Sequence, residues 1–219
     1  MKALSWLRAP LAVAAAPLAI LAAAGLTGAM LDERAFALAG HWPDLLAVPA
    51  RALTDLGKSG WILTTSAALM AGGLLVMARA LTQTMQQRAR AIAMSAAFIF
   101  ASVALSGTTA NLLKRLIGRP RPYQSLEDGS FGLSPLSGAR FEGFPSGHAT
   151  TLGALAACLA ILFPRYRLPI LCLAALLAVT RVIVGAHYPS DIVAGFGYGV
   201  WWAWLVAHFF KSRGFSFKA

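Results

Sequence analysis

The sequence predicts an all-α polytopic membrane protein with about six transmembrane helices and a functional site at one membrane surface. Of its 219 residues, 58% are hydrophobic and only 12% are charged, which is typical of membrane proteins rather than soluble ones. Six apolar stretches approach the roughly 20 residues that a helix needs to cross about 30 Å of hydrocarbon. Because an unpaired backbone cannot cross lipid, these stretches are expected to be helices rather than open strands.

The six predicted spans lie at about 11–30, 59–77, 91–113, 149–163, 168–185 and 189–210, and they leave no room for a separate soluble domain. A signal peptide is an alternative for the first, but its apolar run is longer than a typical signal-peptide core. The fourth span is short, so it is expected to begin before Ala149 or to cross a thinned bilayer. Residues 1–219 are therefore predicted to form a single membrane-embedded domain.

Counting the spans assigns each charge to one side of the membrane. The side of the N-terminus receives ten bases and no acid, and the other side receives nine bases and all eight acids. The bases of the short loop 164–167 and of both termini place the N-terminal side in the cytoplasm. The net charge of +11 does not indicate nucleic-acid binding, because the bases are scattered at helix ends without an aromatic-basic groove.

The first of three polar clusters is NLLKRLIGRPRP at 111–122, where the third span ends. Its glycine and prolines end a helix, and four cations lie within eight residues: Lys114, Arg115, Arg119 and Arg121. Because these cations repel one another, an anion is their natural partner. Taken alone, however, the cluster is better explained by juxtamembrane bases that contact lipid headgroups.

The second cluster is FPSGHATT at 144–151, where the fourth span begins. Ser146 and Gly147 stand where the free N–H groups and the positive dipole end of a helix form a seat for phosphate. His148 follows directly and lies within reach of a bound group. Plain N-capping by Ser146, with His148 as an interfacial residue, explains this pattern equally well.

The third cluster, TRVIVGAHYPSDIVAG at 180–195, links the last two spans. His187 and Asp191 are four residues apart, a spacing that shares one helix face, although Pro189 disfavours helical geometry just before it. A carboxylate bonded to imidazole Nδ1–H fixes the tautomer and leaves Nε2 as a nucleophile or base. A turn capped by Asp191 is the simpler explanation, yet ionisable residues in membrane helices, such as Arg181, are functional candidates.

Span counting places all three clusters at the same membrane surface. Together they supply an anion cradle, two histidines and one orienting carboxylate, an inventory that suits phosphoryl transfer through a histidine. The three clusters contain no acid pair, and the two cysteines of the sequence form no Cys/His cluster of the kind that binds a metal. Neither a metal nor another cofactor is therefore predicted.

The spacing of these residues resembles the type 2 phosphatidic-acid phosphatase superfamily, whose signature is KxxxxxxRP, PSGH and SRxxxxxHxxxD. The chain has all three parts in order, carried by Lys114, Arg121-Pro122, Pro145-Ser146-Gly147-His148, Arg181, His187 and Asp191. Thr180 stands where the family has serine, and its retained hydroxyl is expected to keep the donor role. The motifs cover residues 114–191, and the six-span layout covers essentially the whole chain.

The resemblance implies a role for each matching residue. His187 would attack phosphorus while Asp191 holds its ring, and His148 would protonate the departing oxygen and then activate water. The nonbridging oxygens would be held by five groups: Lys114, Arg121, Arg181, Ser146 and the Gly147 N–H. Arg115 and Arg119 lie outside the signature and are expected to be headgroup contacts or solvated bases. The family needs no metal.

The implied activity is hydrolysis of a phosphomonoester or pyrophosphate on a lipid, in a bacterial inner membrane, with the site facing the periplasm or exterior. Undecaprenyl pyrophosphate, phosphatidylglycerophosphate, phosphatidic acid and lipid A phosphates remain open as substrates, and the oligomeric state is unknown. A lipid phosphotransferase would use the same residues, and a noncatalytic lipid-phosphate-binding protein is the other alternative. The stretch DLLAVPARALTDLG at 44–57 is apolar enough to lie along the interface and shape lipid entry, or is a simple connecting helix.

Overall fold

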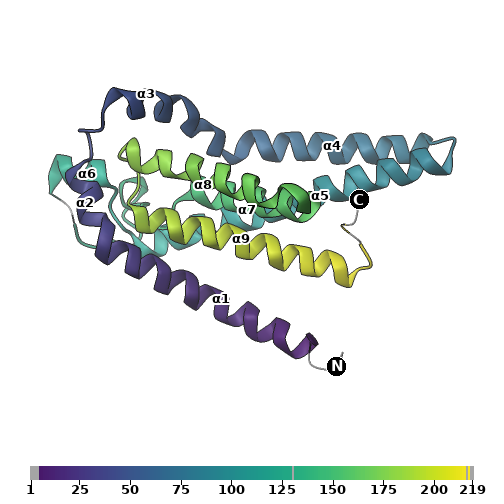
Figure 1. The fold of residues 1–219 in the computed structure, drawn as a ribbon, viewed down its shortest axis with the longest axis horizontal. Coiled ribbons are helices and arrows are strands. Elements are labelled where there is room, and N and C mark those ends of the chain that lie inside the picture. The colour runs from purple at the N-terminus through teal and green to yellow at the C-terminus, as the bar shows by residue number, and fades with distance from the viewer. Residues whose placement is uncertain (1–4, 130, 216, 218–219) are drawn as a thin grey trace.

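In the computed structural model, which describes residues 5–129, 131–215 and 217, six long helices run between the two ends of the molecule (Figure 1). These helices are α1 (Ser5–Thr27), α4 (Ser59–Arg79), α5 (Gln83–Ile117), α7 (Gly147–Leu162), α8 (Arg167–Ile183) and α9 (Pro189–Ser212). The short helices α2, α3 and α6 gather at one end, called the site end below, and the α4–α5 turn lies at the opposite, distal end. Since the described residues contain no strand, the predicted all-α fold is confirmed.

The connections at the site end are themselves helical. A π-helical turn (Gly28–Asp32) and α2 (Glu33–Ala37) follow α1, and α6 (Pro122–Asp128) follows α5. Between them, α3 (Asp44–Leu53) passes through a 3₁₀ turn (Thr54–Gly57) into α4 and packs against α8. The stretch 44–57 is thus a helix with its turn that leads into α4, and its position along the membrane interface stays a prediction.

Five of the six helices are long and apolar enough to cross a membrane, within the described part of the chain. The exception is α7, whose 16 residues extend over only about 24 Å. It begins at Gly147, before Ala149 as predicted, and packs against α5, α8 and α9. Most of its residues, lying between Ala149 and Cys158, are buried by these helices, so α7 packs mainly against protein.

Glycines bring α7 and α9 into close contact. A Cβ atom added to Gly199 would overlap the Thr150 carbonyl oxygen, and one added to Gly195 would overlap the Ser146 carbonyl oxygen. On the α7 side, a Cβ at Gly153 would overlap the carbonyl oxygen of Phe196. These glycines therefore allow the two helices to pack closely, and this contact fixes the start of α7 against the start of α9.

We expect Gly199→Ala to destabilise the protein, because its new Cβ would press on the α7 backbone, which cannot yield as a side chain does. Overpacking of this kind costs about 1–3 kcal/mol, and the start of α7 would move with it. Thermal unfolding in detergent measures the loss. Gly72→Ala is the matched control, since a Cβ at Gly72 in α4 meets nothing within 4 Å. Equal unfolding temperatures for the two variants would contradict the expectation.

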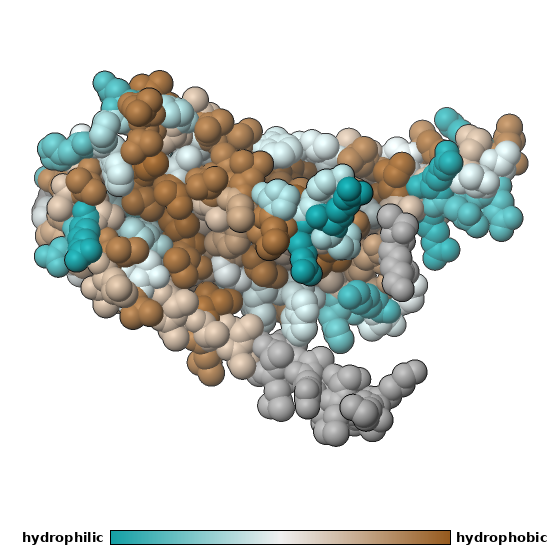
Figure 2. Space-filling model, viewed as in Figure 1, coloured by the Kyte–Doolittle hydropathy of each residue, from teal (hydrophilic) through white to brown (hydrophobic). Residues whose placement is uncertain are grey.

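The charges are sorted between the two ends. All described acidic residues belong to elements at the site end, whereas bases without acids lie at or near the helix ends that point away from it: Arg79, Arg88, Arg90, Arg165, Arg167, Lys211 and Arg213. Figure 2 shows a broad hydrophobic area on this face, with hydrophilic residues at the site end, near the α4–α5 turn and over the centre of the view. The sorting matches the one obtained by counting spans, while the cytoplasmic location of the distal end stays a prediction.

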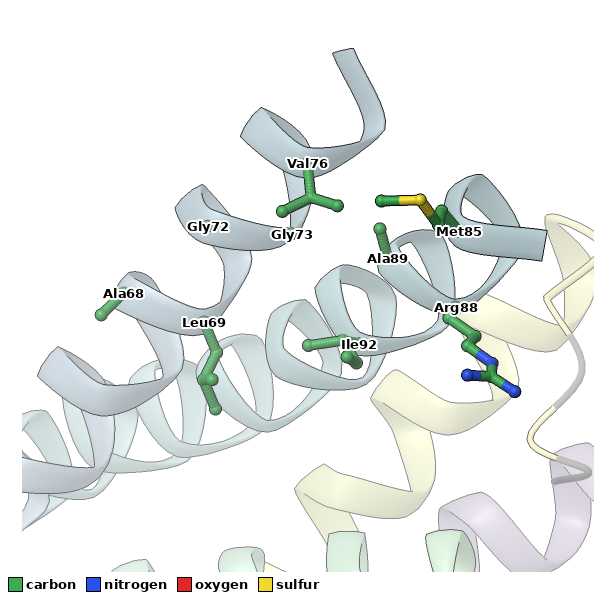
Figure 3. Close-up of a pocket in the computed structure, with 9 residues that line it drawn as sticks. All are labelled: Ala68, Leu69, Gly72, Gly73, Val76, Met85, Arg88, Ala89 and Ile92. Atoms are coloured by element: carbon green, nitrogen blue, oxygen red, sulfur yellow. The ribbon is translucent and has the colours of Figure 1, made fainter. Parts of the chain in front are cut away.

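A groove of about 390 Å³ lies between α4 and α5 toward the distal end (Figure 3). Its wall is apolar apart from Arg88, and the helices approach closely at Gly73, where a Cβ would lie 2.9 Å from that of Ala93. None of the predicted site residues lines it. The groove is therefore separate from the polar clusters at the other end of the molecule.

Candidate active site

The structure brings all eight predicted site residues together at the site end. They come from the end of α5, the chain just after it, the start of α7, the end of α8, the following turn and the start of α9: Lys114, Arg121, Ser146, Gly147, His148, Arg181, His187 and Asp191. The starts of α7 and α9 are joined directly, because the Ser146 N–H donates to the Asp191 carbonyl oxygen at 3.0 Å. Four helices and the segments that connect them thus form one site.

The Lys114 side chain lies next to the start of α7. The helix α5 ends three residues later, where Gly118 adopts φ +65° and donates its N–H to the Lys114 carbonyl oxygen. The side chain is only 6% exposed, and a Cβ on Gly147 would lie 3.1 Å from its Nζ atom. An ammonium group beside the positive end of a helix is unfavourable unless an anion joins the two, so this contact indicates an anion-binding position.

Three polar atoms of the site are buried without a hydrogen-bond partner in the described part of the chain: Arg121 Nε, Arg181 Nε and His148 Nε2. An unsatisfied buried donor costs about 1–3 kcal/mol, so such groups are usually retained for a ligand. The groups are also close in space, because His148 interacts electrostatically with Arg181, His187 and Lys114. Cations and free donors that converge on one point form a cradle suited to phosphate oxygens.

Ser146 combines the two roles that the sequence left open. As the N-cap of α7, its Oγ accepts a hydrogen bond from the Ala149 N–H at 3.4 Å. A hydroxyl that accepts through a lone pair still has its own hydrogen to donate. Capping by Ser146 therefore leaves it available to an anion at the helix start.

The imidazole of His187 is buried and oriented by a backbone carbonyl. Its Nδ1 lies 2.8 Å from the Gly143 oxygen, whereas the nearest Asp191 carboxylate oxygen lies 3.5 Å from Nδ1. The short bond that was predicted to go to Asp191 thus goes to Gly143, and Asp191 is a secondary neighbour. Because a carbonyl oxygen only accepts, Nδ1 carries the hydrogen and Nε2 keeps its lone pair, so the predicted tautomer is retained.

Burial lowers the pKa of His187 well below its usual value of 6.5, and the positive charges of Lys114, Arg121 and Arg181 lower it further. We therefore expect His187 to be neutral at pH 6.5, where a free histidine is half protonated. Nitrogen-15 spectra of histidine-labelled protein in detergent would measure this, with His187→Gln to assign the signal. A half-protonated ring at pH 6.5, or a hydrogen on Nε2, would contradict the expectation.

Asp191 is fully buried and has two stronger partners than His187. Its Oδ2 accepts from the N–H of Tyr188, the N-cap of α9, at 2.8 Å, which makes Asp191 the N3 residue of a capping box, and its Oδ1 accepts from Arg119 Nη1 at 2.6 Å. The expectation that Arg119 is a headgroup contact or solvated base is therefore wrong. Arg115 does behave as expected, since its side chain is 68% exposed and lies 3.5 Å from Glu142.

Three residues that sequence reasoning missed support the site. Thr54 accepts a hydrogen bond from Arg181 Nη1 at 2.9 Å, and the His148 ring packs against Gly57, where a Cβ would lie 3.0 Å from it. Gly143 supplies the carbonyl for His187, and a Cβ there would lie 2.8 Å from the Arg119 carbonyl oxygen. Of the three, only the glycines could have been noticed in the sequence, as possible points of close backbone approach. The sequence does not show which residues approach them.

Thr180 does not direct its hydroxyl as predicted. Its Oγ1 donates to the Leu177 carbonyl oxygen at 2.6 Å, one turn earlier in the same helix. Such back-bonding is common for threonine inside helices and occupies the only hydroxyl hydrogen. The predicted donor role toward the site is therefore not seen, and Thr180 acts as a helix residue next to Arg181.

Comparison with known proteins agrees with this geometry. The family model described as "PAP2 superfamily" matches residues 95–215. Lipid A 1-phosphatases of Rhizobium johnstonii and Rhizobium etli are 46% and 45% identical over 169 residues, covering 76% of this chain and 68% and 72% of theirs. A transmembrane PAP2-type phosphatidylglycerolphosphate phosphatase from Bacillus subtilis has a similar fold, with a TM-score of 0.63 at 20% identity over 93% of this chain and 96% of that one. The extent of these matches means that the chain belongs to the PAP2 superfamily.

Proposed function

We propose that this protein is a membrane phosphatase that hydrolyses the 1-phosphate of lipid A through a phosphohistidine on His187. The observation that carries the reaction is the cradle itself, in which a buried lysine, two half-buried arginines and unpartnered donors lie near a histidine with a free Nε2. The substrate rests on the similarity to two lipid A 1-phosphatases over three quarters of the chain.

In the first step, Nε2 of His187 attacks phosphorus and the bond from phosphorus to the lipid oxygen breaks. His148 donates a proton to that oxygen, so the lipid leaves as an alcohol. Lys114, Arg121 and Arg181 hold the nonbridging oxygens, where negative charge is concentrated in the transition state. The low pKa of His187 favours this step, because only the neutral ring can attack.

In the second step, the now neutral His148 removes a proton from water, and the water oxygen attacks phosphorus. The phosphorus–nitrogen bond breaks, inorganic phosphate leaves, and His187 returns to its neutral form. This reaction requires the two histidines to begin in opposite protonation states, so a bell-shaped dependence of turnover on pH is expected.

We place the protein in a bacterial inner membrane with the site end at the periplasmic surface. The broad hydrophobic area of the surface and the bacterial relatives support the membrane, and the bases at the helix ends that point away from the site end support the orientation. Cysteine labelling at Ser137 in the exposed loop before α7 would test the orientation. Labelling from the cytoplasm alone would overturn it.

The substrate is tested by assaying purified protein in detergent, with a chelator present, against lipid A, phosphatidylglycerophosphate, phosphatidic acid and undecaprenyl pyrophosphate. We expect inorganic phosphate to be released fastest from lipid A, and mass spectrometry to locate the loss at the 1-position. Faster release from another lipid would overturn the substrate. Transfer of phosphate to a second lipid would identify a phosphotransferase, and no turnover of any lipid would favour the noncatalytic alternative.

A further inference from the structure

Asp191 is held on the side away from His187 by groups that belong to none of the three motifs. Arg119 donates from Nη1 to Asp191 Oδ1 at 2.6 Å and to Ser190 Oγ at 2.8 Å. Its Nη2 donates to Asp32 Oδ2 at 2.8 Å. Arg119 therefore bridges the carboxylate of α9 to one that follows α1.

Asp32 and Ser190 close this network. The Ser190 N–H donates to Asp32 Oδ1 at 3.0 Å, and the Ser190 hydroxyl donates to Asp32 Oδ2 at 2.5 Å. The backbone permits the approach because Gly28 has no side chain: a Cβ there would lie 3.3 Å from Asp32 Oδ2. Five hydrogen bonds thus join Asp32, Arg119, Ser190 and Asp191.

The network is buried and electrostatically matched. Asp191 is 0%, Ser190 4% and Asp32 9% exposed, and the two carboxylates would repel each other without the guanidinium between them. The Arg119 guanidinium also lies over the Tyr188 ring, 4.3 Å from its centroid. Because both terminal nitrogens and one face of the group are engaged, Arg119 has a single defined orientation.

Arg119 is directed away from the phosphate cradle. Its partners are Asp32, Asp191, Ser190 and Tyr188, and it borders a cleft of about 580 Å³ beside α1 rather than the cations that act on His187. Asp32 also lies outside residues 95–215, which match the family model. Neither residue is therefore placed to bind phosphate directly.

We propose that Asp32 and Arg119 are positioning residues, which fix the Asp191 carboxylate and through it the ring of His187 for attack. This inference rests on the proposed function, in which His187 is the nucleophile. Asp32 follows the first membrane helix and lies outside the three sequence motifs, so this helix would contribute to catalysis through it. In metal sites, loss of a residue that holds a metal ligand in place lowers metal affinity or activity about 10–100-fold, and we expect a loss of similar size here.

The test measures formation of phosphohistidine in a single turnover, with ³²P-labelled lipid A and the full-length protein in detergent. We expect Asp32→Asn and Arg119→Lys each to lower the rate constant about 10–100-fold while the KM for lipid A stays within about threefold. The first change removes a charge at nearly constant shape, and the second keeps a charge that cannot bridge two carboxylates. The double variant should be no slower than the slower single variant, because both act through one network.

The matched controls are Glu33→Gln and Arg115→Lys, which alter an exposed neighbour of Asp32 and an exposed arginine of the same cluster. Both should keep the wild-type rate constant. A merely structural role would lower the amplitude through loss of folded protein and leave the rate constant unchanged, which would overturn the positioning role. Unchanged rate constants in Asp32→Asn and Arg119→Lys would also overturn the positioning role. If the wild-type protein itself forms no phosphohistidine, the proposed function is overturned, and the inference with it.

Discussion

Replacing His187 with alanine is expected to abolish both phosphate release from lipid and the labelling of the protein by ³²P-labelled substrate. In the proposed reaction Nε2 of His187 forms the only bond between protein and phosphorus. Removing the nucleophile from a comparable catalytic unit lowers turnover by about 10⁶-fold, and we expect a loss of at least about 10³-fold here. Wild-type protein should carry a label that is lost in acid and stable in alkali, as expected of a phosphoramidate.

His208→Ala is the matched control for this change. His208 lies near the distal end of α9, is exposed and stacks on Trp204, far from the cradle. It should retain wild-type turnover and labelling. Labelling that persists in His187→Ala, or that disappears in His208→Ala, would contradict the assignment of the nucleophile.

The helices are largely predictable from the sequence because their signals are local. Apolar runs and their flanking glycines and prolines locate five spans and the ends of α5 and α8–α9 to within a few residues. The start of α5 is the exception, since the helix begins at Gln83 with Thr82 as its N-cap, ahead of the predicted apolar run. The residues from Gln83 to Arg90 are mostly polar, so hydropathy alone does not include them.

The motif residues are also predictable, because their spacing and chemical types are sufficient to identify the cradle. The support of the cradle is not. Arg119 is 87 residues from Asp32 in sequence, and a basic residue near a membrane surface is equally compatible with a lipid headgroup and with a buried ion pair. Gly143 acts through its backbone carbonyl, for which a sequence contains no side-chain signal.

The charges of the site form two layers with different requirements. On the side of Arg119, the guanidinium and two carboxylates satisfy one another, so this layer is stable in the absence of substrate. On the side of Lys114, Arg121 and Arg181, cations and free donors are gathered without an acidic partner of comparable proximity among the described residues. His187 lies between the layers, so a phosphate that completes the second layer is placed directly before Nε2.

Replacing His148 with asparagine is expected to separate the two chemical steps. With lipid A, turnover should fall about 10²–10⁴-fold, because no group protonates the departing oxygen or activates water. With para-nitrophenyl phosphate the leaving group departs as a stable anion and needs no proton. We therefore expect one equivalent of nitrophenolate to appear rapidly, followed by a stalled phosphohistidine that can be isolated.

This burst distinguishes the general acid and base from a residue that only binds phosphate. Arg181→Lys is the comparison, because it weakens the hold on the phosphate oxygens and removes the bond to Thr54 while leaving His148 in place. It should slow the reaction of both substrates without accumulation of phosphohistidine. If His148→Asn slows para-nitrophenyl phosphate as much as lipid A and shows no burst, then His148 binds phosphate rather than transferring protons, and the proton must come from elsewhere in the site.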